Sequence, residues 1–191
     1  MDKTELNTFY ITLAAVINVS PELAIKLVKG FNDGDLEFFQ SYFEALPKAN
    51  FRRNNSKNGS ANETLYVKDA EAGKGVFGVV SRNKTYPFVY KKISDNKLPS
   101  ERLDYLKSIY KEVIVQTLLQ SDTLYGENIC TIYKVYRMGN DCVMKLEVLQ
   151  VTLKDRLKTP EKSWTGKVLD QSALIRAILL KLFTILNYLQ Y

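Results

Sequence analysis

The chain has 191 residues, 46% of them hydrophobic, which is long enough for one ordinary domain with an extension. Its net charge of +6 would suit an anionic partner, but the basic residues are spread along the chain, so nucleic-acid binding is not the expected function. With no histidine and only two cysteines, a Ser-His-Asp triad and an imidazole or thiolate metal site are excluded. So few cysteines indicate reduced thiols, and hence an intracellular, cytoplasmic protein.

Residues 1–47 are predicted to form three short helices. The apolar stretch from Phe9 to Val19 is short for a membrane span and is expected to be a core helix, so no membrane partner is expected. Ser20-Pro21-Glu22 is a helix start signal and Gly30 a stop signal. A third helix is predicted to begin at Asp35 and to end before Pro47. Its apolar positions fall on one face: Leu36, Phe39, Phe43 and Leu46.

Residues 48–63 are rich in Asn, Ser, Gly, Lys and Arg and contain hardly any apolar residue. This composition predicts a basic flexible linker between the helical extension and the rest of the chain. A basic patch for phosphate or nucleic acid is the alternative. The extension itself would either brace the next domain or recruit a partner.

The remaining sequence predicts a domain at 64–150 and a further segment at 151–191. Strands are expected at 64–71, 76–82, 86–93, 129–138 and 142–148, and the last two are joined by the turn Gly139-Asn140-Asp141. A long helix is expected to begin at a capping Ser100. Its predicted buried residues are Leu103, Leu106, Ile109, Val113 and Leu118. Two more helices are expected at 152–157 and 171–190.

A glycine-rich run at residues 71–80 carries the most specific signal in the chain. Its glycines, Gly73, Gly75 and Gly78, follow the spacing G-x-G-x-x-G, which is weak by itself because many turns contain glycine. In a dinucleotide-binding fold the last glycine begins a helix, whereas here it leads into Val79-Val80 and a hairpin. Glycines in a hairpin let backbone N–H groups approach phosphate oxygens, while Phe77 at the tip would exclude water. An ordinary flexible hairpin is the alternative.

Two charged residues complete the pattern. Lys91 and Lys92 both follow the glycine hairpin, and the choice depends on strand parity. Lys91 shares a face with Val89, which is small enough to cover an adenine ring, whereas Lys92 shares a face with Tyr90; Lys91 is therefore the predicted ligand. Glu112, 21 residues further on in the long helix, is predicted to pair with this lysine and fix it against phosphates.

This combination resembles the amino-terminal lobe of the eukaryotic-type protein kinases, specifically the serine/threonine kinases, over residues 64–190. The resemblance implies an α+β fold: a five-stranded antiparallel sheet with the long helix in the place of helix C, preceded by the helical extension and followed by the first helices of a carboxyl lobe. It assigns Lys91 and Glu112 as catalytic residues. The implied ATP-binding residues are Gly73, Lys74, Gly75, Val76, Phe77, Gly78, Val80, Val89, Lys91, Met144, Lys145 and Glu147. Met144 would be the gatekeeper, and the backbone of Lys145–Glu147 would face the adenine edge. Ala72 departs from the usual Leu or Ile.

The family's catalytic loop and its D-F-G aspartate have no counterpart in the sequence, so ATP is the implied cofactor while the ligands of its Mg²⁺ are not in this chain. Alone, the chain is therefore not expected to transfer phosphate. One interpretation is that it is the front part of a kinase, completed by a carboxyl lobe and acting on a protein substrate. The other is a truncated pseudokinase that regulates a partner kinase. A third, a basic helical domain that docks on nucleic acid or a capsid, rests on the first 63 residues. The abundance of Asn, Lys, Ile and Tyr would suit an AT-rich genome, viral or microbial.

Overall fold

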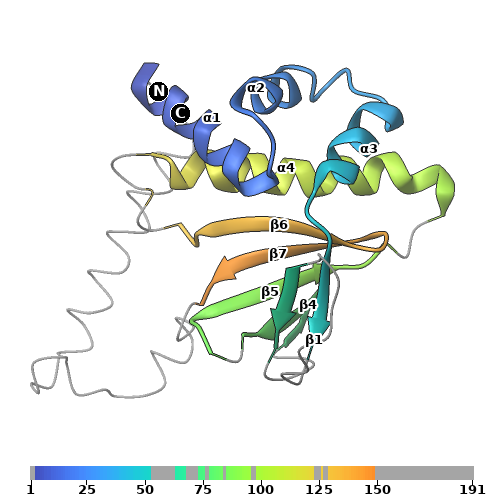
Figure 1. Ribbon diagram of the computed structural model, residues 1–191. Helices are drawn as coiled ribbons and strands as arrows, with labels where there is room; N and C mark the ends of the chain where they lie inside the picture. Colours follow the sequence, from blue (N-terminus) through green and yellow to red (C-terminus); the bar gives the residue numbers. More distant parts are fainter. Residues whose placement is uncertain are drawn as a thin grey trace, which may run out of the picture. The chain divides into compact units, whose positions relative to one another are not determined.

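The structure is a computed structural model, and it describes residues 3–52, 63–67, 73–75, 78–83, 85–95, 98–122, 126 and 129–148. The chain divides into two units, Met1–Val148 and Leu149–Tyr191, and every described residue belongs to the first. The helices predicted at 152–157 and 171–190 therefore lie outside the described residues. The first unit is an α+β structure in which helices lie on one side of an antiparallel sheet (Figure 1).

Three helices form the amino-terminal part, as predicted: α1 (Lys3–Ile17), α2 (Pro21–Lys29) and α3 (Leu36–Ala45). The Ser20 side chain accepts a hydrogen bond from the Leu23 N–H, and Asp35 Oδ1 accepts one from the Phe38 N–H at 2.9 Å. Both caps satisfy donors that the first turn of a helix leaves without a partner. The predicted buried face of α3 is wrong at Leu36, which is 41% exposed, while Tyr42 is buried instead.

The main sheet has the strand order β3-β4-β5-β7-β6, with all neighbours antiparallel. Its longer strands are β4 (Gly78–Arg82), β5 (Phe88–Ile93), β6 (Ile132–Met138) and β7 (Asp141–Glu147). The three-residue β3 (Gly73–Gly75) lies at the edge beside β4. The predicted turn between β6 and β7 is present, and Gly139 adopts φ +64° in it, a conformation that glycine enters at little cost.

A second, two-stranded sheet corrects two predictions. Strand β1 (Ala49–Arg52) lies within the predicted linker and pairs in parallel with β2 (Glu63–Tyr66). The described part of the strand expected at 64–71 is β2, which pairs in this small sheet, and residues 68–71 lie outside the described residues. The cause is burial: Ala49, Leu65 and Val67 are each 3% exposed or less and pack against the main sheet beside Tyr90, Tyr136 and Val143.

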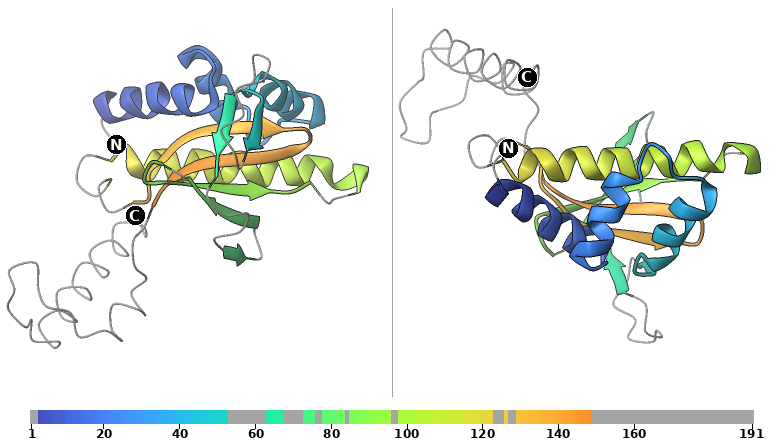
Figure 2. Two further views of the ribbon diagram at one scale, coloured as in Figure 1. Left: turned by 60° about the horizontal axis from the view of Figure 1, so that its bottom comes forward. Right: turned by 90° about the horizontal axis from the view of Figure 1, so that it is seen from above.

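The long helix α4 (Arg102–Gln120) crosses the opposite face of the main sheet (Figure 2). Ser100 does not cap it, because Pro99 begins a 3₁₀ turn (η1, Pro99–Glu101) that contains Ser100 and leads into the helix. As predicted, Leu106, Ile109 and Val113 are fully buried.

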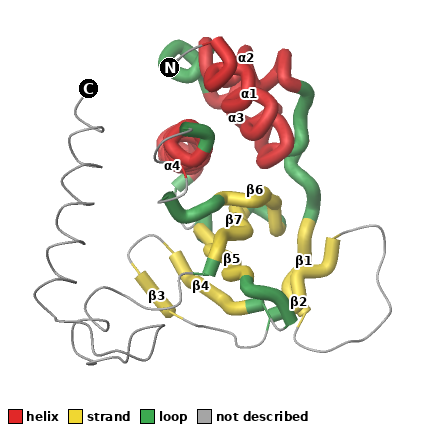
Figure 3. The backbone as a smooth tube through the Cα atoms, turned by 90° about the vertical axis from the view of Figure 1, so that its left-hand side faces the viewer, coloured by secondary structure: helices red, strands yellow, loops and turns green. Residues whose placement is uncertain are grey.

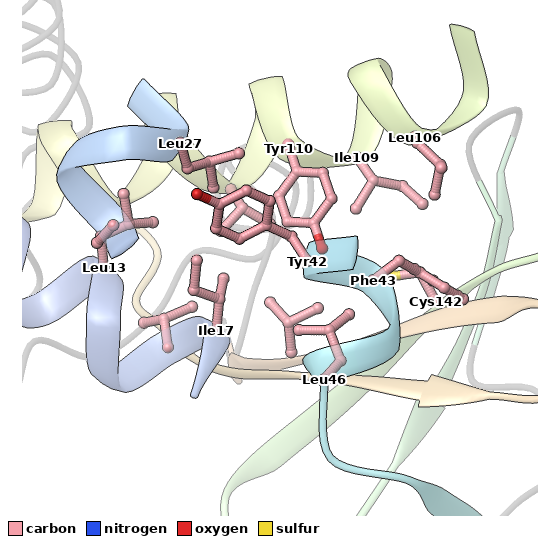
Figure 4. Packing of buried hydrophobic residues seen from close by; sticks show 14 of the residues in the cluster. Leu13, Ile17, Leu27, Tyr42, Phe43, Leu46, Leu106, Ile109, Tyr110 and Cys142 are labelled. Atoms are coloured by element: carbon pink, nitrogen blue, oxygen red, sulfur yellow. The ribbon is translucent and has the colours of Figure 1, made fainter. Parts of the chain in front are cut away.

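The amino-terminal helices are part of the same core as α4 and are not a separate domain. Figure 3 shows α1, α2 and α3 gathered with α4 on one side of strands β5, β6 and β7. One hydrophobic cluster joins Leu13, Phe43 and Tyr110 from three different helices to Cys142 of the sheet (Figure 4). Residues 3–45 therefore pack onto the same core as α4 and the sheet.

Within the described part of the chain, no single helix is long and apolar enough to cross a membrane. The pair α1 and α2 passes the same test on length and composition, but the two helices meet at a 100° bend.

Candidate functional site

A lysine–glutamate ion pair connects the sheet to α4. Lys91 Nζ lies 2.6 Å from Glu112 Oε1, which confirms the predicted pairing of these residues. The lysine comes from the middle of β5 and the glutamate from the middle of α4. The two side chains are 18% and 34% exposed, so water screens the pair only in part.

Strand register places four of the predicted site residues on one face of the sheet. Lys91 lies opposite Val80 of β4 and opposite Met144 of β7, and cross-strand partners share a face. Val89, two positions before Lys91, is on this face as well. Because Met144 belongs to the core beneath α4, this is the face that the helix covers in part. The structure therefore brings together Val80, Val89, Lys91 and Met144 on the side of Glu112.

Lys92, the alternative lysine, has a different partner. Its Nζ lies 2.8 Å from Asp141 Oδ2, in the turn that begins β7. Asp141 Oδ1 also accepts a hydrogen bond from the backbone N–H of Asp95. Lys92 thus links the end of β5 to the β6–β7 turn and points to the face opposite Lys91.

The glycine residues form a hairpin, as predicted, in which Gly73 lies opposite Val80 and Gly75 opposite Gly78. Gly78 adopts φ +135°, and a Cβ on it would lie 2.2 Å from the Lys92 carbonyl oxygen. Glycine is required at this position by the backbone of the neighbouring strand, whether or not a phosphate binds. The predicted site residues Val76 and Phe77 and the side chain of Lys74 lie outside the described residues.

The predicted contact between an adenine edge and the backbone of Lys145–Glu147 is corrected by the sheet. This segment lies in β7, between β5 and β6, and its residues are paired on both sides. The Glu147 N–H donates to the Thr131 carbonyl at 2.9 Å, and the Val148 N–H donates to the Pro87 carbonyl. A backbone contact with a base would have to come from residues after Val148, which the structure does not describe.

The side chains of the same segment also have structural partners. Glu147 Oε2 accepts hydrogen bonds from the backbone N–H and the hydroxyl of Thr131, both at 3.1 Å. Lys145 Nζ lies 4.1 Å from the centre of the Phe88 ring, a favourable cation–π distance. Met144 is fully buried, so it contributes to the core between the sheet and α4.

Cys142 lies in the buried surroundings of the ion pair. Burial raises the pKa of its thiol, the negative charge of Glu112 raises it further, and the positive charge of Lys91 opposes that effect. The thiol therefore stays protonated at neutral pH, which makes it a weak nucleophile.

Three polar residues of α4 that contact the sheet were not predicted from the sequence. They are Tyr105, Gln116 and Gln120, and each makes a hydrogen bond with a backbone group of the sheet or of the segment that leads into it. Their spacing from Glu112 was a usable signal, because all of them lie on one side of an α-helix.

The chemistry of this site is that of a fixed cation beside a glycine hairpin. An ammonium group held by a carboxylate is suited to binding and orienting an anion. Among the described residues, no three His, Cys, Asp or Glu side chains gather as a metal site. No protein-family model, curated protein or solved structure matches this chain.

Proposed function

We propose that this chain binds ATP through the face of the main sheet that carries Lys91, as the ATP-binding portion of a serine/threonine protein kinase. The observation that carries the proposal is the 2.6 Å ion pair between Lys91 and Glu112, on the same face as Val80 and Val89 and next to the glycine hairpin. When bound, ATP would supply the phosphoryl group, and this chain would hold and orient it.

The donor set on this face suits a nucleoside triphosphate. Glu112 limits the motion of the Lys91 side chain, so the ammonium group is available to phosphate oxygens at a lower entropic cost. Val80 and Val89 are half-buried and lie beside Lys91 on the same face, where they offer an apolar surface to an adenine ring.

Phosphoryl transfer requires more than this face. It depends on carboxylates that hold Mg²⁺ and on a residue that orients the acceptor hydroxyl, and the sequence contains no H-R-D or D-F-G motif. We therefore propose transfer to a protein hydroxyl only for this lobe completed by a carboxyl lobe that supplies those groups. A regulatory module directed at another kinase remains the alternative, and it does not require ATP.

Equilibrium binding of a fluorescent ATP analogue with Mg²⁺ tests the proposal in the full chain. Lys91→Met should weaken binding about 10- to 150-fold, because a charge-assisted hydrogen bond contributes about 1.5–3 kcal/mol. Lys92→Met is the matched control: it removes the same charge from the next residue, on the opposite face, and should leave affinity within about threefold. Equal losses in both variants, or no binding by the unmodified chain, would refute ATP binding at this face.

A further inference from the structure

We propose that Tyr105, Gln116 and Gln120 are positioning residues that fix the rotation and height of α4, so that Glu112 meets Lys91. The consequence for nucleotide binding rests on the function proposed above, whereas the consequence for the ion pair does not. No motif in the sequence assigns a role to any of the three.

The spacing of these residues places them in line with Glu112. Tyr105 is seven positions before Glu112, Gln116 four positions after it and Gln120 eight positions after it. At about 100° per residue, all four side chains fall within a stripe about 80° wide along the helix. On this side of α4, Tyr105 therefore lies before Glu112, and Gln116 and Gln120 lie after it.

Tyr105 attaches the first half of α4 to the sheet. Its hydroxyl donates to the Ile93 carbonyl at 3.0 Å and accepts from the Cys142 N–H at 3.2 Å. Ile93 is two residues from Lys91 on the same strand, so this contact sets the position of the helix relative to the strand that carries the lysine.

The two glutamines attach the second half. Gln116 Nε2 donates to the Cys130 carbonyl at 2.5 Å. The Gln120 side-chain amide accepts from the Ile132 N–H at 2.8 Å and donates to the Ile132 carbonyl at 3.3 Å, so it pairs with both backbone groups of one residue at the start of β6.

Apolar packing alone does not define the orientation of α4. The helix is buried against the sheet on one side and against α1 and α3 on the other. Burial of apolar surface is non-directional, so a helix covered on two sides could rotate or slide by a residue and still bury apolar atoms. Hydrogen bonds are directional and are lost with a shift of that size. Arg102, which pairs with Asp95 and donates to the Asn140 carbonyl, fixes the start of the helix. The polar stripe fixes the rest of it in the orientation in which Glu112 reaches Lys91.

The test is chemical cross-linking with a carbodiimide, which joins a carboxylate and an amine only when they are in contact, followed by mass spectrometry of the linked peptides. Both ion pairs of β5 are partly exposed and so accessible to the reagent. The Lys92–Asp141 link serves as an internal standard for the two glutamine variants, because neither residue lies in α4 and neither glutamine bonds to the β6–β7 turn. Tyr105 bonds to Asn140 and Cys142 on either side of Asp141, so its variant is compared with the unmodified chain instead.

In Gln116→Met and in Gln120→Met, we expect the ratio of the Lys91–Glu112 link to the Lys92–Asp141 link to fall several-fold. In Tyr105→Phe, we expect the yield of the Lys91–Glu112 link to fall several-fold relative to the unmodified chain. Two matched controls should leave the ratio unchanged. Gln40→Met removes a glutamine that bonds to Glu44 within α3, and Tyr42→Phe removes a hydroxyl that donates to the Leu23 carbonyl, between α3 and α2. The three single variants are measured separately, so the loss of one to misfolding leaves the others as tests.

An unchanged ratio in the folded variants would overturn the positioning role. A reduced ratio together with weaker binding of the ATP analogue supports both the positioning role and the proposed function. In that case Gln116→Met should not weaken binding further in a chain that already carries Glu112→Gln. A reduced ratio in a chain that binds no nucleotide supports the positioning role and refutes the proposed function.

Discussion

Replacing Gly78 with alanine should be one of the most damaging small substitutions in the sheet. The residue has φ +135°, a conformation that side chains rarely adopt and that costs about 1–3 kcal/mol for a non-glycine residue. The new Cβ would also lie 2.2 Å from the Lys92 carbonyl oxygen and 3.1 Å from its carbonyl carbon. These atoms belong to the backbone of the paired strand and cannot rotate away, so overpacking adds about 1–3 kcal/mol. The expected total is about 2–6 kcal/mol.

The matched control is Gly139→Ala. Gly139 also has positive φ, at +64°, but a Cβ there meets no atom within 4 Å. Its cost is limited to the left-handed conformation, about 1–2 kcal/mol, offset by about 0.4–1 kcal/mol through the less flexible unfolded chain. Urea denaturation of both variants gives the two free energies of unfolding. If Gly78→Ala costs no more than Gly139→Ala, the close approach between β4 and β5 is not the reason for the glycine.

Two further predictions concern the core and its ionisable groups. Phe39→Ala in α3 should lower the free energy of unfolding by about 3–5 kcal/mol. Because α3 and α4 belong to one core, far- and near-ultraviolet circular dichroism should still report one shared unfolding transition. Separate transitions would show that the amino-terminal helices unfold on their own. Stability should also fall as pH rises above about 9. Burial raises the pKa values of Cys142, Tyr105 and Tyr110, so the unfolded chain ionises these groups, from ordinary values of 9.0 and 10.0, before the folded chain does. Below pH 9 the groups are protonated in both states and have no effect. Above about pH 9 for Cys142, and above about pH 10 for the two tyrosines, each group lowers the free energy of unfolding by up to about 1.4 kcal/mol per pH unit. Urea midpoints that stay constant between pH 8 and pH 10 would contradict this sign.

The parts of the fold that local chemistry determines were predictable from the sequence. The caps at Ser20 and Asp35 and the turn at Gly139 depend on residues within a few positions of one another. The face of Lys91 was predictable too, because alternation along a strand needs no knowledge of the partner strand. The Lys91–Glu112 pair followed from that face combined with the resemblance of the whole pattern to a known lobe.

The parts that depend on distant partners were not predictable in the same way. Strand β1 lies in a largely polar stretch of sequence, and it forms because Ala49 and Phe51 pack against the main sheet and because β2 lies in register beside it. Likewise, the sequence does not show that β7 lies between two strands, where the backbone of Lys145–Glu147 is paired on both sides. Ser100 failed as a cap because Pro99 starts a tighter turn one residue earlier.

Labelling with an acyl-phosphate derivative of ATP tests most directly whether Lys91 faces the phosphates of a bound nucleotide. The reagent acylates a lysine amine that lies next to the phosphates, and peptide mapping identifies the modified residue. We expect Lys91 to be labelled, the labelling to decrease when excess ATP competes, and Lys92, which points to the opposite face, to remain unmodified. Labelling of Lys92 as strong as that of Lys91, or labelling of Lys91 that excess ATP does not reduce, would contradict nucleotide binding at this site.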